Sequence, residues 1–197
     1  MQRGFFYTDG IQRSSYREQG ESVCGGKGDC LPAGCHECKG RGLRLLDSGT
    51  TPVYLLPQLL AHHVKIVTPS IYLIKKIPIT YKGDIYLLGG RFSPDYDLST
   101  GSMAVDMIRN FNFDHAFFST NGVNMESGEV YIFDMEIGTM KKEIMKKSQN
   151  NHLLIDDSKF HIKAMFSWAS LEDFTNVYVN RLPDTGEAPD NFTVCLS

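Results

Sequence analysis

The sequence predicts an α/β fold in which a mostly parallel sheet is flanked by helices. Short apolar runs typical of strands alternate with segments of helical periodicity, and Gly, Pro, Asn or Asp residues separate them. The connections between these segments are short, which favours parallel strands covered on both faces. Of the 197 residues 42% are hydrophobic, which is enough for one core of this kind.

Six apolar runs are expected to form the strands of the sheet. The expected strands are residues 43–47, 64–68, 84–88, 115–119, 152–156 and 176–179. A tight loop follows the first strand, two glycines end the third, and Asn121 and Gly122 are expected to form a turn after the fourth. Each of these features predicts that the strand before it ends there and that the chain turns away from the sheet.

Four segments are expected to be helical. They are a helix that begins at residue 52 and helices over 70–76, 101–111 and 134–148. Thr51 and Pro52 suit the N-cap and the first position of the first helix, whereas Pro57 predicts a kink or an early break within it.

The expected helix over 134–148 is amphipathic. Its apolar residues on one face are Ile137, Met140, Ile144 and Met145. The two lysine pairs, 141–142 and 146–147, indicate a solvated face on the same helix.

The composition changes near residue 42. Residues 1–42 hold nine of the 18 glycines and four of the five cysteines, but only three Val, Ile or Leu residues. Few side chains there can be buried, so we expect a poorly structured segment or an aberrant start, frameshifted or fused. The α/β domain is expected over residues 43–180, and residues 181–197 form a C-terminal tail.

Charge and hydropathy exclude some functions. Lys and Arg total 20 against 23 acidic residues, whereas a chain that binds nucleic acid on its own usually carries a basic surplus. No apolar run approaches the roughly 18 residues that span a bilayer. We therefore expect a cytoplasmic protein that binds neither DNA directly nor a membrane. An odd cysteine count in a chain of this size favours reduced thiols.

A zinc site is a weaker possibility within the first 42 residues. The segment from Cys35 to Gly42 matches one CxxCxGxG repeat, as in DnaJ-type zinc domains, and Cys24 and Cys30 complete a set of four thiols. The repeat occurs once, however, and Cys24 and Cys30 lack the paired spacing. An incidental Gly- and Cys-rich segment is thus favoured, and we expect neither a metal nor a cofactor. The weaker candidate ligands are Cys24, Cys30, Cys35 and Cys38.

The candidate ligand site lies in the loops at the carboxyl ends of the expected strands, where parallel sheets bind their ligands. Residues 48–51, Ser-Gly-Thr-Thr, combine a glycine that permits close approach with hydroxyls and the amides that begin a helix, which suits a phosphate. The alternative is a capping turn and nothing more. Lys159 would add a positive charge, and Asp47 and Asp156 would accept hydrogen bonds from sugar hydroxyls.

Five collinear motifs resemble the effector-sensing domain of DeoR-family bacterial transcriptional regulators. They are LLDSGTT at 45–51, VKIVTPS at 64–70, IYLLGGRF at 85–92, FDHAFFSTNGV at 113–123 and LLIDDSKF at 153–160. The resemblance covers about 43–180. It implies a fold related to ribose-5-phosphate isomerase and the CoA transferases, and a pocket for a phosphorylated sugar from carbohydrate catabolism.

The resemblance also implies an assembly and a set of ligand residues. The implied protein is a homo-oligomer, a repressor in its full-length form, which contacts DNA through a separate N-terminal winged helix that residues 1–42 do not resemble. The effector would be a hexose or ketose phosphate from phosphotransferase uptake. The implied ligand-binding residues are Asp47, Ser48, Gly49, Thr50, Thr51, Thr68, Ser70, Gly89, Gly90, Asn121, Gly122, Asp156 and Lys159, with Glu136 as a weaker candidate.

The chain departs from the family pattern at three places. Pro69 replaces an Asn, His161 replaces a Gly, and Pro57 interrupts a helix that is usually continuous. Two alternatives therefore stay open. One is a sugar-phosphate isomerase of the same fold, with acid and base groups drawn from Asp47, Glu136, Asp156 and Lys159. The other is a truncated oligomerisation module. We expect no enzyme and no catalytic residue.

Overall fold

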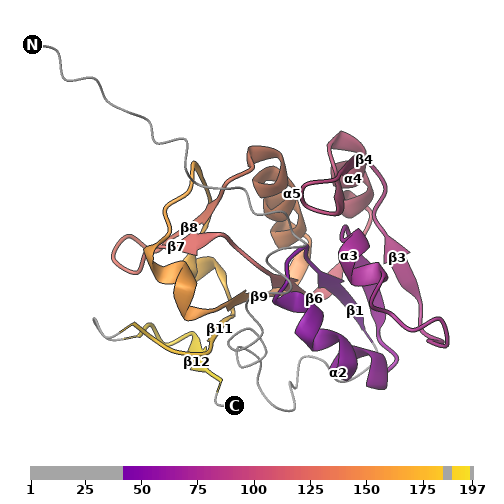
Figure 1. Ribbon diagram of the computed structural model, residues 1–197, viewed down its shortest axis with the longest axis horizontal. Helices are drawn as coiled ribbons and strands as arrows, with labels where there is room; N and C mark the ends of the chain where they lie inside the picture. Colours follow the sequence, from indigo (N-terminus) through magenta and orange to yellow (C-terminus); the bar gives the residue numbers. More distant parts are fainter. Residues whose placement is uncertain (1–41, 184–187, 196–197) are drawn as a thin grey trace, which may run out of the picture.

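The structure, a computed structural model, describes residues 42–183 and 188–195 (Figure 1). Its centre is a seven-stranded sheet in which every neighbouring pair is parallel. In sheet order the strands are β12 (Phe192–Val194), β11 (Asn176–Val179), β9 (Ser148–Ile155), β6 (Phe113–Phe118), β1 (Leu43–Leu46), β2 (Lys65–Thr68) and β3 (Ile85–Leu87). The expected α/β class is confirmed, and β12 lies within the segment that the sequence analysis sets apart as a tail.

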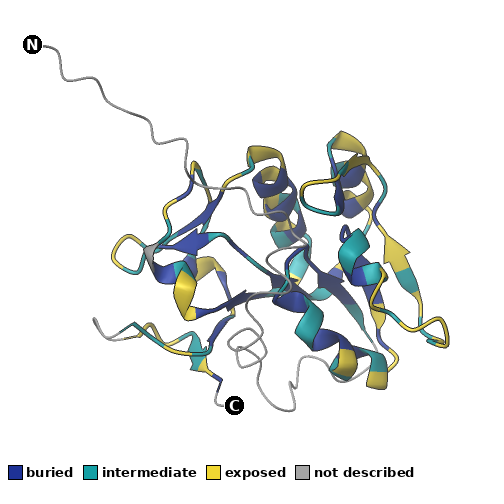
Figure 2. Cartoon of the chain, viewed as in Figure 1, coloured by how far each residue is buried: buried dark blue, intermediate teal, exposed yellow. Residues whose placement is uncertain are grey.

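The helices cover the two faces of this sheet. One face is covered by the 3-10 helix η3 (Pro52–Leu55), α2 (Leu56–Ala61) and α3 (Ile71–Ile74), and the other by α4 (Ser102–Arg109) and α5 (Met135–Lys146). Successive strand residues alternate between the faces, so that Leu45 packs in the α4–α5 core and Leu46 in the α2–α3 core. Both cores are dark blue in Figure 2.

The first helix breaks early, as Pro57 predicts. The chain forms η3 and then restarts as α2, with Pro57 in the first turn, where its missing amide costs no hydrogen bond. The expected positions of Thr51 and Pro52 are confirmed, since Thr51 is the N-cap of η3 and Pro52 its first residue. Thr51 has helical backbone angles, however, and its side chain makes no capping hydrogen bond to the described residues. Capping side chains are found instead at Ser70, before α3, and at Asp134, before α5.

Two antiparallel elements were not expected. Strands β7 (Gly122–Val123), β8 (Glu129–Ile132) and β10 (Phe166–Ser170) form a small sheet, and β4 (Arg91–Ser93) and β5 (Leu98–Thr100) form a hairpin. The turn expected at Asn121–Gly122 is wrong, because Gly122 already pairs with Tyr131 in β8. Strand β9 also begins four residues earlier than expected, since pairing with β6 holds its polar start in the sheet.

One lysine contradicts the solvated face expected for α5. Lys141 is 1% exposed, whereas Lys142 and Lys146 are exposed. The reason lies in the helical period: Lys141 follows Ile137 by four residues and precedes Ile144 by three, so it falls on the buried stripe.

Several expectations concern residues that the structure does not describe. The candidate zinc ligands Cys24, Cys30, Cys35 and Cys38 lie outside the described residues, as does nearly all of the segment 1–42. In residues 42–183 and 188–195 no group of three His, Cys, Asp or Glu side chains could hold a metal ion. Within the same ranges, no helix has the length and apolar character needed to cross a membrane.

Candidate functional site

The chain reverses direction across the sheet between β1 and β6. From β1 it runs through η3 and α2 on one face to β2 and β3, whereas from β6 it returns through α5 on the other face to β9. The loops after β1 and β6 therefore leave the same edge in opposite directions. Such a topological switch point opens the crevice in which sheets of this kind bind ligands.

The loops expected to form the site do lie in a row along this edge. From β9 to β3 they are residues 156–159, 119–122, 47–51, 68–70 and 89–90. Because all five strands are parallel, their carboxyl ends meet at one edge, and the loops after β6 and β1 are neighbours at the switch point. Glu136, by contrast, belongs to the α-helix α5.

The loop after β1 is packed against the loop after β6. Asp47 is fully buried and Ser48 nearly so, while Thr50 is partly exposed. A Cβ atom on Gly49 would lie 2.4 Å from Ser119 Oγ, so only glycine allows the two loops to approach this closely. In the described chain the amides of Ser48 and Gly49 donate to no other residue.

Asp47 faces inward rather than into solvent. Its Oδ2 atom accepts hydrogen bonds from the Ser119 amide at 3.0 Å and from the Lys141 ammonium. Lys141 also donates to the Ser119 carbonyl oxygen at 2.9 Å. Burial lowers the pKa of Lys141, and the carboxylate of Asp47 opposes part of that shift. The structure thus places Asp47 beneath the loop as the anchor of a buried ion pair.

Lys141 is the residue of this site that sequence reasoning missed. The signal that would have found it is the position of Lys141 on the apolar stripe of α5, four residues after Ile137. A lysine on such a stripe is buried only if it is paired, and Asp47 is its partner.

The loops after β2 and β3 use most of their polar groups internally. Thr68 Oγ1 accepts from the Ser70 amide at 3.1 Å, and Ser70 Oγ caps α3 through the Leu73 amide. Both side chains are fully buried. The Gly89 amide lies 3.1 Å from Met107 Sδ, and the neighbouring Gly90 is exposed with a φ angle of 145°. The loops after β2 and β3 could therefore contact a ligand through backbone groups rather than through free hydroxyls.

In the loop after β6, Asn121 and Gly122 connect the large sheet to the small one. Asn121 Oδ1 accepts from the Phe133 amide at 3.0 Å, and the Asn121 amide donates to the Tyr131 carbonyl oxygen. A Cβ atom on Gly122 would lie 1.9 Å from the Ile162 carbonyl oxygen. The contacts of these two residues thus join the end of β6 to the small sheet and to η4.

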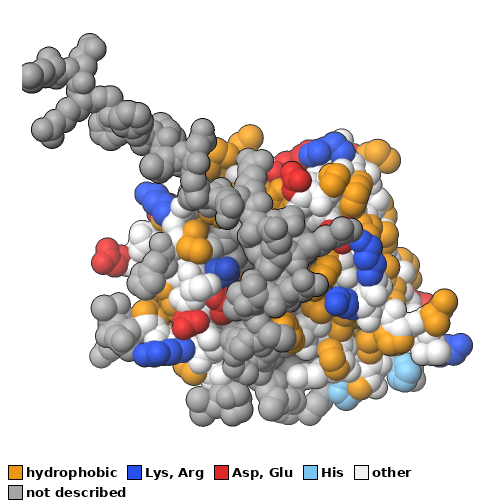
Figure 3. Space-filling view, in the orientation of Figure 1, with side chains coloured by type: hydrophobic (Ala, Val, Ile, Leu, Met, Phe, Trp, Pro, Cys, Tyr) orange, Lys and Arg blue, Asp and Glu red, His pale blue; other side chains and the backbone are white. Residues whose placement is uncertain are grey.

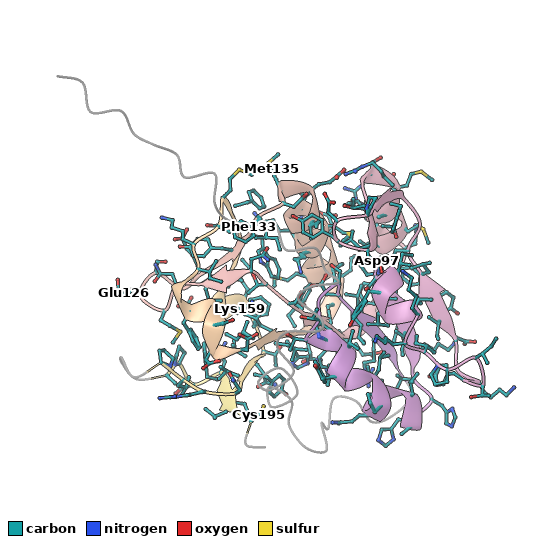
Figure 4. The ribbon with its side chains drawn as sticks, viewed as in Figure 1. Asp97, Glu126, Phe133, Met135, Lys159 and Cys195 are labelled. Atoms are coloured by element: carbon teal, nitrogen blue, oxygen red, sulfur yellow. The ribbon has the colours of Figure 1, made fainter. Side chains whose placement is uncertain are left out.

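The loop after β9 carries an acceptor that lacks a donor. Asp156 is 4% exposed, and its Oδ1 atom accepts from the Ser158 amide at 3.0 Å, which caps the 3-10 helix η4 (Asp157–His161). Its Oδ2 atom is buried and has no hydrogen-bond partner among the described residues. Nearby Lys159, labelled in Figure 4, is partly exposed and forms no ion pair with a described residue. Buried acceptors are rarely left unpaired, so the Oδ2 atom of Asp156 is positioned to accept a hydrogen bond from a ligand.

Glu136 forms an ion pair outside the row of loops. Its carboxylate pairs with Arg91 of β4, and with Gly101 and Met135 it lines a groove between α4 and α5. The carboxylate of Glu136 is therefore paired with the β4–β5 hairpin.

The comparisons with known proteins identify the class. The family described as the DeoR C terminal sensor domain matches residues 40–181, and the chain belongs to this family. A putative sgc region transcriptional regulator of Escherichia coli (strain K12) is 28% identical over 141 residues, which are 71% of this chain and 54% of that protein. The glycerol-3-phosphate regulon repressor of the same strain is 27% identical over 139 residues, 70% of this chain and 55% of the repressor.

The chain spans about half the length of these curated relatives. Among solved structures, a ribose 5-phosphate isomerase from Plasmodium falciparum is similar with a TM-score of 0.42 and 14% identity, over 64% of this chain and 47% of that one.

Proposed function

We propose that this sensor domain binds a phosphorylated sugar in the crevice between the loops after β1, β6 and β9. The observation that carries the proposal is the buried, unpartnered Oδ2 atom of Asp156, beside Lys159 and at the same edge as the Ser-Gly-Thr-Thr loop. A sugar hydroxyl would donate to Asp156. A phosphate would accept from the amides of residues 48–51 and pair with the Lys159 ammonium.

In the intact regulator we propose that this ligand is the effector. The two relatives described above are named as a regulator and a repressor, which favours sensing over turnover. DNA would be contacted by a separate winged helix, and effector binding would change its affinity for the operator in the cytoplasm. Hexose and ketose phosphates of the kind that phosphotransferase uptake produces are the class we propose to test first.

A thermal-shift screen tests the proposal. The purified chain is heated with a panel of sugar phosphates, with the matching free sugars and inorganic phosphate as controls. A ligand present at about 100 times its Kd adds about 2.7 kcal/mol to the free energy of unfolding. We expect one class of sugar phosphate to raise the midpoint and Lys159→Ala to abolish the shift.

Lys146→Ala is the matched control for this screen. Lys146 is an exposed lysine at the end of α5 that leads into the start of β9, on the opposite edge of the sheet from the crevice. The Lys146→Ala chain should respond to the ligand as the wild-type chain does. A panel without any response, or an equal loss in both variants, would contradict the proposal. Turnover of a pentose phosphate by the wild-type chain would favour an isomerase instead.

We also propose that the chain forms a homo-oligomer. Large apolar side chains are exposed on neighbouring elements at one end of the sheet, among them Tyr86 and Leu87 of β3, Phe92 of β4 and Met103 of α4. Figure 3 shows hydrophobic side chains over this region. Exposed apolar surface of this kind is typical of subunit contacts. Light scattering after size-exclusion chromatography tests the proposal, and a monomeric mass would contradict it.

A further inference from the structure

A buried ion pair lies directly beneath the crevice. The Lys141 ammonium, from α5, contacts the Asp47 carboxylate at the end of β1, and their side chains are 1% and 0% exposed. Lys141 also donates to the Ser119 carbonyl oxygen, 2.9 Å away, at the end of β6. One side chain on α5 thus holds the ends of the two strands that diverge at the switch point.

Hydrogen bonds connect the ion pair to the loop that follows β1. The Ser119 hydroxyl lies 3.0 Å from Asp47 Oδ2 and 2.6 Å from the Ser48 carbonyl oxygen, and it donates to one of these acceptors at a time. Gly49 packs against the same hydroxyl. The position of residues 48–51 is therefore set by Lys141 through Asp47 and Ser119.

Stability alone is a poor reason for this arrangement. Removing two charges from water is costly, and replacing a buried ion pair by uncharged residues of similar volume is often neutral or stabilising. A side chain such as methionine at 141 would continue the apolar stripe formed by Ile137, Met140 and Ile144. A functional reason is therefore required.

Charge provides such a reason. The Asp47 carboxylate immediately precedes Ser48, and a bare carboxylate there would repel a phosphate that approaches the amides of the loop. The Lys141 ammonium neutralises this carboxylate from behind. It does so without occupying the crevice, because the lysine is buried on the α5 side of the sheet.

We propose that Lys141, acting through Asp47, is a positioning residue for phosphate recognition by the Ser-Gly-Thr-Thr loop. It holds the loop against Ser119 and cancels the negative charge beneath the loop, but does not touch the ligand. This inference rests on the proposed sugar-phosphate function and adds to it the residue on which the phosphate site depends.

The test compares stability with affinity in the same variants. The double variant Asp47→Asn/Lys141→Met removes both charges, whereas Lys141→Arg keeps the positive charge. Urea unfolding gives the stability of each variant, and calorimetric titration gives Kd for the sugar phosphate that the wild-type chain binds best. Lys142→Met, which removes the exposed neighbouring lysine, is the matched control.

We expect the double variant to keep the urea midpoint of the wild-type chain but to bind about tenfold or more weakly, because no ammonium then holds the ends of β1 and β6 together and the amides of the loop lose their fixed position. Lys141→Arg keeps the positive charge, so its affinity should lie between that of the double variant and that of the wild type. Lys142→Met should bind as the wild type does. A stable double variant with wild-type Kd would overturn the inference.

If the double variant does not fold, Ser119→Ala decides the question. It removes only the hydroxyl that links Asp47 to the Ser48 carbonyl, and we expect it to weaken phosphate binding severalfold. An unchanged Kd would overturn the inference. A wild-type chain that binds no member of the panel would instead contradict the proposed function.

Discussion

Removing the ammonium of Lys141 alone should strongly destabilise the domain. In Lys141→Met the carboxylate of Asp47 stays fully buried and keeps the hydrogen bonds from Ser119 and from the Ser48 hydroxyl, but no positive charge. Breaking a buried ion pair in this way costs about 3–5 kcal/mol, because the remaining charge is neither solvated nor paired. The expected loss is thus a large part of the roughly 5–15 kcal/mol by which a domain is stable.

This loss is large enough to measure by two methods. For a chain of 150–250 residues, about 1 kcal/mol shifts the thermal midpoint by roughly 2–4 °C, so Lys141→Met should melt about 6–20 °C below the wild type. Urea unfolding should give the same loss as a lower midpoint with an unchanged slope.

An exposed lysine of the same helix provides the control. Lys146 is 69% exposed and pairs with Glu143 on the surface, where such pairs are worth about 0–1 kcal/mol. Lys146→Met should therefore melt close to the wild type. If Lys141→Met also stays within about 1 kcal/mol of the wild type, the burial of the Asp47–Lys141 pair is refuted.

Three further predictions follow from single sites. Gly122→Ala should prevent stable folding, because its Cβ atom would meet the Ile162 carbonyl oxygen at 1.9 Å, whereas Gly89→Ala, whose Cβ atom meets only a flexible side chain at 3.4 Å, should melt like the wild type. Hydrogen bonds from neighbouring hydroxyls lower the pKa of Glu129, so the stability it adds is present above the ordinary carboxyl pKa and is lost as the pH falls. The difference in thermal midpoint between the wild type and Glu129→Gln should accordingly be largest near neutral pH, and an unchanged difference in acid would contradict this. Burial raises the pKa of the Cys195 thiol to about 11, so mass spectrometry should find its peptide alkylated at pH 8 only after denaturation, and rapid labelling of the native chain would contradict the burial.

The strands of the large sheet were largely predictable because their residues carry the signal themselves. Runs such as Val64–Thr68 are apolar, β-branched and bounded by turn residues, so local propensity and burial agree. The start of β9 was missed for the opposite reason. Residues 148–151 are polar, and they are held in the sheet by pairing with β6, a contact distant in sequence.

The loops of the site were predictable from the parallel sheet, but the roles of their side chains were not. Thr68 and Ser70 look like free hydroxyls in the sequence, yet both are buried in local hydrogen bonds. Lys141 looks like half of a solvated pair with Lys142, although the helical period places it on the apolar stripe with Ile137 and Ile144; its partner Asp47 is 94 residues away in the sequence and could not be predicted. Which polar group is free and which is occupied depends on contacts between segments far apart in the chain.

The most direct test of the account is a crystal structure of the chain with the sugar phosphate that stabilises it most. The account predicts the phosphate within hydrogen-bond distance of the amides of residues 48–51 and of the Lys159 ammonium, with a sugar hydroxyl on Asp156 and with Asp47 still bound to Lys141. A ligand bound elsewhere, such as in the groove between α4 and α5, would contradict it.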